Sequence, residues 1–182
     1  METIYPGRYR HYKGNYYEVI GEAAHSETME SLVVYRALYG AYGLWVRPKA
    51  MFLEAVVVGG RAVLRFEPVI SIEVWRAEAG QNGEGYFQQF EVPSREPLSV
   101  MTLLAKVHEL DAGFACRTST CFKGKCGSCL VKVDGQETFG CVKLINPGAK
   151  VVIEPSAKFK LIRDVVVDFS QPLNTGEEVE QR

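Results

Sequence analysis

Apolar residues in the first third of the chain come in short runs that turn residues separate. Runs of this kind predict strands. The strands lie at residues 16–20, 32–37, 44–47, 51–58 and 62–66. Glycine, asparagine and proline mark the turns between them, and no helical period of useful length is present. Short strands with regular turns predict a small all-β domain, a curled sheet or barrel, over residues 1–68.

The second segment, residues 69–171, differs from the first because its pattern includes a helix. Alternating residues predict strands at 70–76 and 86–92, which a turn rich in glycine and asparagine joins as a hairpin. Apolar residues at positions i, i+3, i+4 and i+7 then predict an amphipathic helix. These residues are Val100, Leu103, Leu104 and Val107, with Ser99 as the candidate N-cap and Asp111 to Gly113 as the stop.

Four cysteines follow the helix at the spacing C-x4-C-x2-C-x11-C. They are Cys121, Cys126, Cys129 and Cys141. Four thiolates at this spacing are what a [2Fe–2S] cluster requires, so we expect these residues to be its ligands. The first three lie on one loop, in which Gly124 and Gly127 permit a tight curl that points backbone N–H groups at the sulfur atoms.

A second predicted hairpin delivers the fourth cysteine. Its strands lie at 130–133 and 137–140 around the turn Asp134-Gly135, and a further strand is expected at 151–154. The order hairpin, helix, cysteine loop, hairpin and strand is the β-grasp arrangement of [2Fe–2S] ferredoxins. We therefore predict two domains, the all-β domain followed by an α+β, β-grasp, ferredoxin-like domain.

The main alternative for the four cysteines is a structural zinc site. Zinc ribbons prefer two C-x2-C pairs, whereas this chain has one such pair. The fifth cysteine, Cys116, also stands at x4 spacing from Cys121, but a motif that begins at Cys116 loses the C-x4-C-x2-C pattern. We expect Cys116 to pack beside the loop as a small apolar residue, and the alternatives are a redox-sensitive thiol or a spare ligand.

Two lysines, Lys123 and Lys125, stand between the first two candidate ligands. One hypothesis is that their charges raise the reduction potential, because a nearby cation favours the more negative, reduced cluster. The other is that they bind an acidic partner. Replacing both by glutamate separates the two, because the first predicts a lower midpoint potential and the second predicts salt-sensitive electron transfer at an unchanged potential.

Composition and charge exclude several classes of function. The net charge is −1, so nothing points to nucleic acid. No apolar run approaches the ~20 residues of a membrane span, and the N-terminus has no signal-peptide core. An odd number of cysteines with four at ligand spacing favours a reducing compartment, so we expect a cytoplasmic protein. Residues 172–182 are acidic, and we expect them to be disordered.

The first segment resembles DUF1653, a domain family of unknown function. Residues 5–15 (Tyr-Pro-Gly-Arg-Tyr-Arg-His-Tyr-Lys-Gly-Asn) carry the resemblance, together with 25–28, 32–35 and 44–48. The resemblance implies a small β-rich domain and no established chemistry. We expect His25 to be a structural hydrogen-bonding residue, with metal binding or base catalysis as the alternative. A candidate recognition surface comprises Tyr5, Tyr9, Arg10, Tyr12, Trp45 and Arg47.

The second segment resembles the N-terminal ferredoxin domain of the iron–sulfur subunit of succinate dehydrogenase and fumarate reductase. The resemblance is carried by the four cysteines, by Asp134-Gly135 and by the stretch from Leu161 to Asp168. In that family this stretch leads into a second, helical domain with two more clusters. We do not expect that helical domain within the present chain.

No substrate-activating group accompanies the cysteines, so we expect an electron relay whose catalysis, if any, lies in a partner. The resemblance implies that this partner is a flavoprotein or another iron–sulfur subunit. The first domain would then serve for docking or recognition. The alternative is a sensor or assembly module, in which the cluster reports redox state or iron supply and the first domain binds the output partner.

Overall fold

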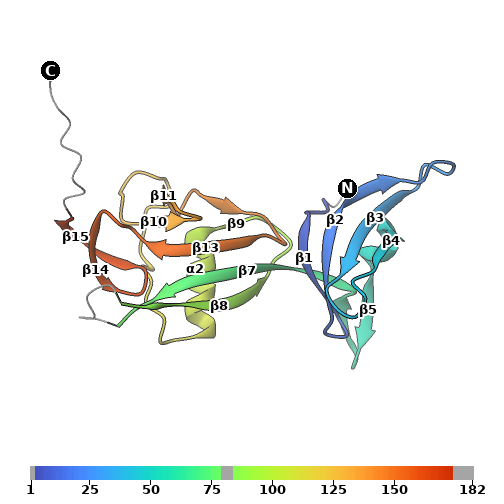
Figure 1. Ribbon diagram of the computed structural model, residues 1–182, viewed down its shortest axis with the longest axis horizontal. Coiled ribbons are helices and arrows are strands. Elements are labelled where there is room, and N and C mark those ends of the chain that lie inside the picture. Colours follow the sequence, from blue (N-terminus) through green and yellow to red (C-terminus); the bar gives the residue numbers. More distant parts are fainter. Residues whose placement is uncertain (1–2, 79–83, 174–182) are drawn as a thin grey trace, which may run out of the picture. The chain divides into compact units, whose positions relative to one another are not determined.

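The computed structural model describes residues 3–78 and 84–173, and these form two compact units (Figure 1). The first unit contains the whole of the N-terminal segment predicted over residues 1–68. Its residues are 1–71, 91–98 and 145–150. The second unit holds the candidate cluster ligands. Its residues are 72–90, 99–144 and 151–182. The part of the acidic tail beyond residue 173 and the turn at 79–83 lie outside the described residues.

Antiparallel strands form the first unit, in the order β7-β1-β2-β3-β4. Their bounds are β1 Gly7–His11, β2 Tyr16–Ala24, β3 Ser31–Ala37, β4 Leu44–Pro48 and, shared with the second unit, β7 Phe66–Arg76. The predicted strands at 16–20, 32–37 and 44–47 are confirmed. Strand β1 was not predicted because arginine, tyrosine and histidine give it no apolar alternation. The domain boundary that we predict at residue 68 falls inside β7.

Aromatic rings fill the core of the first unit. Phe52 is fully buried and stacks on Phe66, with 4.3 Å between the ring centroids. Phe52 lies on the short helix α1 (Lys49–Phe52), so the strand predicted over 51–58 is wrong in its first half. Its second half forms β5 (Ala55–Val58), which pairs with β6 (Arg61–Leu64). The aromatic core therefore needs a helical turn where local apolar content indicates a strand.

The second unit combines a sheet with one long helix. The strand order is β11-β10-β13-β7, and β8 also pairs with β7. The bounds are β8 Tyr86–Pro93, β9 Leu98–Ser99, β10 Leu130–Val133, β11 Gln136–Phe139, β12 Leu144–Ile145 and β13 Lys150–Pro155. The strands predicted at 70–76, 86–92, 130–133, 137–140 and 151–154 are all confirmed. The α+β architecture predicted for this segment is therefore the one observed.

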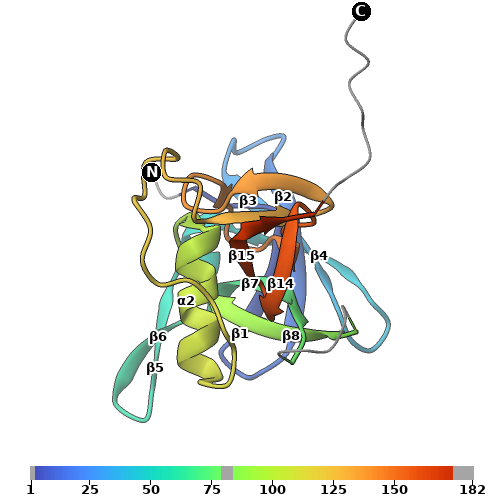
Figure 2. The same cartoon turned by 90° about the vertical axis from the view of Figure 1, so that its left-hand side faces the viewer.

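Helix α2 (Val100–Leu110) lies along one side of the second unit, next to β7 and β8 (Figure 2). The predicted apolar face is buried. The Ser99 side chain accepts a hydrogen bond from the Thr102 N–H at 3.1 Å, which confirms the predicted N-cap. Asp111 is the C-cap. Burial of one face, rather than intrinsic propensity, stabilises a helix of this length.

A hairpin that the sequence pattern did not predict follows β13. Its strands are β14 (Phe159–Arg163) and β15 (Val166–Pro172), paired in antiparallel register. Asp164, in the turn, has a left-handed φ of +50°. The stretch from Leu161 to Asp168, noted above only as a family signature, is thus folded back on itself within the second unit.

Candidate iron–sulfur centre

The loop that carries the first three cysteines curls through left-handed backbone conformations. Phe122, Gly124 and Gly127 have φ values of +51°, +65° and +74°. Glycine adopts such values without a steric penalty, as we expected for Gly124 and Gly127. The resulting curl brings the residues between Cys121 and Cys129 around the sulfur atoms instead of extending them as a strand.

Backbone N–H groups of this loop point at the sulfur of Cys121. The Lys123 N–H donates to Cys121 Sγ at 3.4 Å and the Cys126 N–H does so at 3.5 Å. Hydrogen bonds from the Lys125, Cys126 and Lys123 N–H groups lower the pKa of Cys121 from 9.0 to about 6. The loop therefore stabilises the thiolate, which is the form that binds metal.

The four cysteines lie in two pairs. Side-chain contacts join Cys121 to Cys126 and Cys129 to Cys141. Cys129 and Cys141 are buried and Cys126 is exposed, while all four thiols are free of disulfides. Within the described residues, no three His, Cys, Asp or Glu side chains are placed to hold one metal ion. Two pairs of thiolates fit a cluster of two irons, each of which takes two protein ligands.

Backbone hydrogen bonds place Cys141 beside Cys129. The Gly140 N–H donates to the Cys129 carbonyl at 2.9 Å. The first turn of α2 is joined to the same region, because the Met101 N–H donates to the Gly140 carbonyl at 3.1 Å and the Val100 N–H to the Lys143 carbonyl at 3.0 Å. The first N–H groups of a helix have no partner within the helix. Here those of Val100 and Met101 bond to carbonyl groups of Lys143 and Gly140, on either side of Cys141.

Gly140 is closely packed where these segments meet. A Cβ atom at this position would lie 3.3 Å from the Cys129 carbonyl oxygen, from Met101 Sδ and from Val100 Cγ1. Gly140 was not among the site residues predicted from the sequence. Its position directly before the fourth cysteine is the one signal that could have suggested it.

Cys116 lies outside the two pairs of cysteines. Its thiol donates to the Leu104 carbonyl at 3.6 Å, and burial raises its pKa. These contacts agree with the packing role that we expected for Cys116. His25 also has structural partners, because its Nδ1 accepts hydrogen bonds from the Glu27 and Thr28 N–H groups at 3.2 and 3.3 Å.

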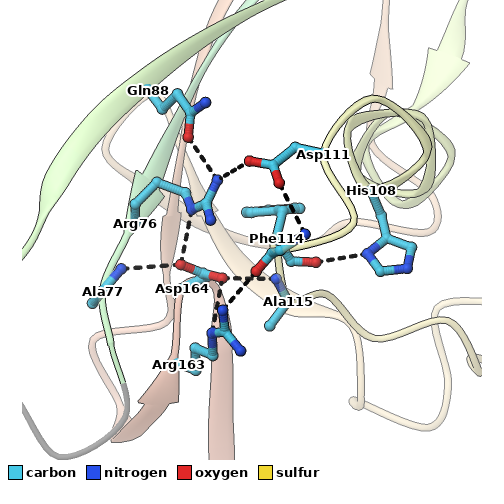
Figure 3. Close-up of polar contacts among 10 residues, drawn as sticks. Arg76, Ala77, Gln88, His108, Asp111, Phe114, Ala115, Arg163 and Asp164 are labelled. Atoms are coloured by element: carbon cyan, nitrogen blue, oxygen red, sulfur yellow. Dashed lines mark hydrogen bonds and ion pairs between the residues drawn. The ribbon is translucent and has the colours of Figure 1, made fainter.

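A buried carboxylate, Asp164, holds the chain that leads to the cysteine loop (Figure 3). The Asp164 side chain is 2% exposed. Its Oδ1 accepts from Arg76 Nε at 3.1 Å and from the Ala77 N–H at 3.0 Å. Its Oδ2 accepts from the Ala115 N–H at 2.7 Å. Asp164 thus joins the end of β7 to the segment that precedes the first candidate ligand.

Arg76 extends this polar network to the helix. Its Nη1 donates to Gln88 Oε1 on β8 and to Asp111 Oδ2 at the end of α2, both at 2.6 Å. The Arg76 guanidinium also lowers the pKa of Asp111. Asp111 Oδ1 accepts the Gly113 N–H at 2.9 Å. This network was not predicted from the sequence because its members are up to 88 residues apart.

The predicted recognition surface of the first unit is only partly exposed. Tyr9 belongs to the core, with 3% of its surface exposed, so including it was wrong. Trp45 is 58% exposed and Tyr12 is 38% exposed. Arg10 forms an ion pair with Glu67 at 2.8 Å. Within the described residues of this unit, exposed aromatic side chains lie on the edge strand β4, in the β1–β2 turn and in the β3–β4 connection, where Tyr39 and Tyr42 are 44% and 56% exposed.

The fold and the cysteine loop define the second unit as a ferredoxin-type domain with four candidate cluster ligands. Residues 71–174, more than half of the chain, match the 2Fe-2S iron-sulfur cluster binding domain family, and the chain belongs to this family. Its cofactor is accordingly a [2Fe–2S] cluster. Residues 7–68 match the family "Protein of unknown function (DUF1653)". Both resemblances stated from the sequence are confirmed.

Relatives of the second segment include components of fumarate reductase and succinate dehydrogenase. The chain is 34% identical over 104 residues to one of the subunits of the fumarate reductase (CoM/CoB) of Methanothermobacter marburgensis. The matched region is 57% of this chain and 20% of that protein. It is 36% identical over 94 residues to mitochondrial succinate dehydrogenase iron-sulfur subunit 3 of Arabidopsis thaliana, and the matched region is 49% of this chain and 30% of that protein. The chain thus spans less than a third of the length of these relatives.

Two solved structures are also similar to the chain. A chain of the Mycobacterium smegmatis Sdh1 complex matches with a TM-score of 0.50 at 20% identity, over 64% of this chain and 54% of that one, which shows a shared fold. A DUF1653 protein from Bordetella bronchiseptica matches over 36% of this chain and 87% of that one, at 40% identity and a TM-score of 0.34. Among the described residues, no helix is both long and apolar enough to cross a membrane.

Proposed function

We propose that this chain is a one-electron carrier in which Cys121, Cys126, Cys129 and Cys141 bind the [2Fe–2S] cluster. The observation that carries the proposal is the division of these cysteines into two adjacent pairs, with the first three on a loop whose N–H groups point at the sulfur of Cys121. When bound, the cluster supplies reversible one-electron chemistry. The chain supplies the thiolates and the dipoles that stabilise negative charge on them.

Different parts of the site have different tasks. The burial of Cys129 and Cys141 keeps water from one side of the ligand set, and α2 holds that side rigid through its contacts with Gly140. Cys126 is exposed, and its thiol contacts the Ser128 hydroxyl at 3.0 Å. Electrons would therefore enter and leave on the side of Cys126, where a partner can approach.

The partner in this proposal is a flavoprotein or another iron–sulfur subunit, to or from which the cluster passes single electrons. Support comes from the relatives, which are named as subunits of fumarate reductase and succinate dehydrogenase. In the same proposal the first unit, with its exposed Trp45, serves as the docking or recognition module. The chain would then be a non-catalytic component of an oxidoreductase in the cytoplasm.

Anaerobic purification followed by EPR of the dithionite-reduced protein tests the cluster. We expect a [2Fe–2S] signal and reversible reduction in a redox titration. The variant C116S should keep the visible absorption of the cluster, because Cys116 lies outside the pairs of ligands. The variant C121S should lose or strongly alter it. Absence of the EPR signal from the reduced wild-type protein would contradict the proposal.

A redox or iron sensor is the second candidate function, favoured by the exposure of Cys126, since an exposed ligand is open to oxidants. The two functions differ in what oxidation does. A carrier returns to its starting spectrum after repeated cycles of reduction and oxidation. A sensor loses the cluster on oxidation, and its binding of a partner changes with that loss.

A further inference from the structure

We propose that the exposed surface beside the cysteine loop is the docking site for an acidic surface of the redox partner. We call this surface the loop face, and it consists of Phe122, Lys123, Lys125, Val142, Lys143 and Leu144. This inference rests on the proposed function, since it assigns the place where the electron carrier meets its partner. It goes further by naming the residues and the chemistry of the surface that they bind.

The loop face contains three exposed apolar side chains. Phe122, Val142 and Leu144 are 55%, 52% and 59% exposed. They come from two segments that meet, because a Cβ built on Gly124 would lie 3.3 Å from Val142 Cγ1. Exposed apolar side chains close together beside a functional site indicate a surface that a partner covers.

The curl of the cysteine loop determines how Phe122 is presented. Its φ of +51° is left-handed, which is sterically unfavourable for a residue with a bulky side chain. The ring is exposed, so burial within this chain does not compensate for that cost. The curl therefore presents an exposed aromatic ring next to Cys121, where a partner could cover it.

Three lysines stand within three residues of these apolar groups in the sequence. Lys123, Lys125 and Lys143 are exposed, and within the described part of the chain none of them forms an ion pair. The sequence has no aspartate or glutamate from 118 to 133 or from 138 to 153. By contrast, Lys132 beside this region is paired with Glu154 at 3.2 Å.

These features fit one kind of occupant, a redox protein whose cofactor lies near an acidic, partly apolar surface. Lysines that are free in solution steer a partner of opposite charge and fix its orientation. Apolar contact area accompanied by polar and charged groups is usual in a protein–protein interface. Because Cys126 is exposed in the same loop, a partner bound here would lie next to the ligands of the cluster.

Small oxidants of opposite charge test the electrostatic part of the proposal. The double variant K123E/K125E changes the net charge by four units, and K158E/K160E makes the same change on exposed lysines of the β14 hairpin region, outside the loop face. The reduced holoprotein is mixed with ferricyanide, an anion, or with hexaamminecobalt(III), a cation. Oxidation rates are measured at about 0.1 M ionic strength.

We expect K123E/K125E to slow oxidation by ferricyanide about tenfold and to accelerate oxidation by hexaamminecobalt(III) by a similar factor. The reason is that four charge units act on the oxidant over about one Debye length. The control variant should change each rate less than about twofold. If the lysines instead tune the cluster potential, both oxidants change in the same direction, because both respond to the same driving force. That result, or equal effects of the two variants, would overturn the proposal.

A protein probe tests the docking contact without using electron transfer as the readout. Flavodoxin, an acidic flavoprotein, is mixed with the holoprotein and treated with a carbodiimide. The carbodiimide links lysine amines to nearby carboxylates. We expect the linked peptides to contain Lys123, Lys125 or Lys143, and the yield to fall at least threefold in F122S. Links spread evenly over all lysines, or a yield unchanged in F122S, would contradict the proposal.

The docking site and the proposed function can fail separately. If the protein shows no [2Fe–2S] EPR signal, the proposed function fails and the docking inference fails with it. If the signal and the reversible potential are present but the oxidant and crosslinking results are negative, only the docking site is wrong. The visible spectra of all variants are recorded first, so that loss of the cluster is not mistaken for loss of docking.

Discussion

Replacing Asp164 by asparagine tests whether the polar network of Figure 3 holds the second unit together. Asparagine keeps the volume and tolerates the left-handed φ of +50° at this position, so the backbone need not move. The charge that faces Arg76 is lost. Oδ1 and Oδ2 both accept hydrogen bonds from N–H groups, so the amide NH2 faces a donor whichever way it is turned.

The expected cost follows from the burial of the carboxylate. Asp164 is 2% exposed, so water cannot replace the missing acceptor. Removing one partner from a buried ion pair costs about 3–5 kcal/mol. Arg76 keeps Asp111 as a counter-ion at 2.6 Å, which places the expected loss near the lower end, at about 3 kcal/mol. For a unit of this size, that corresponds to a decrease in Tm of about 12–24 °C.

Urea denaturation of the apoprotein in a Trp45→Phe background, in which Trp75 of the second unit is the remaining tryptophan, measures this loss by fluorescence. The control is Asp168→Asn, the same chemical change on the same hairpin. Asp168 contacts only Ser170 and Gln171 among the hydrogen bonds observed for its side chain, so its replacement should leave the urea midpoint nearly unchanged. A loss below about 1 kcal/mol in Asp164→Asn, or equal shifts of the midpoint in the two variants, would refute the structural role.

Three further predictions concern the cysteine loop and the first unit. Gly140→Ala should lower the cluster content per protein, measured by visible absorption, and should lower the free energy of unfolding by about 1–3 kcal/mol, because three atoms lie 3.3 Å from the new methyl group. The control Gly21→Ala, which has open space around it, should change neither quantity. In the apoprotein, iodoacetamide should alkylate Cys121 with a midpoint near pH 6, and Cys116 only at higher pH, because burial raises the pKa of Cys116. Alkylation of Cys121 and Cys116 at equal rates would contradict this prediction. The folding stability that comes from the lowered Cys121 pKa should be complete above about pH 9 and lost as the pH falls through about 6. Phe52→Ala should destabilise the first unit by about 3–5 kcal/mol in urea denaturation, since the ring is fully buried against Phe66.

The elements that were predicted correctly are those with a local cause. Helix α2 shows a complete apolar period and a serine cap, and both act within a few residues. The hairpin β10–β11 has Asp134-Gly135, whose φ values of +47° and +82° suit a tight turn. The cysteine loop could be predicted because its ligand spacing and glycines are contiguous in the chain.

The errors occur where distant residues decide the local structure. Helix α1 replaces part of an expected strand because Phe52 must reach the ring of Phe66. Strand β1 has little apolar pattern of its own and is defined by its pairing with β2 and β7. The hairpin β14–β15 turns at Asp164, whose partners lie at Arg76 and Ala115.

The cofactor class, the four candidate ligands and the two kinds of domain follow from residue types at short spacings, so the amino-acid sequence was enough to predict them. How the site is built depends on contacts in three dimensions. A Cβ on Gly140 would lie 3.3 Å from the Cys129 carbonyl oxygen, the same oxygen that accepts the Gly140 N–H. A carboxylate from the β14–β15 turn holds the segment that leads into the loop. Contacts of this kind join residues far apart in the chain, and no local pattern records them.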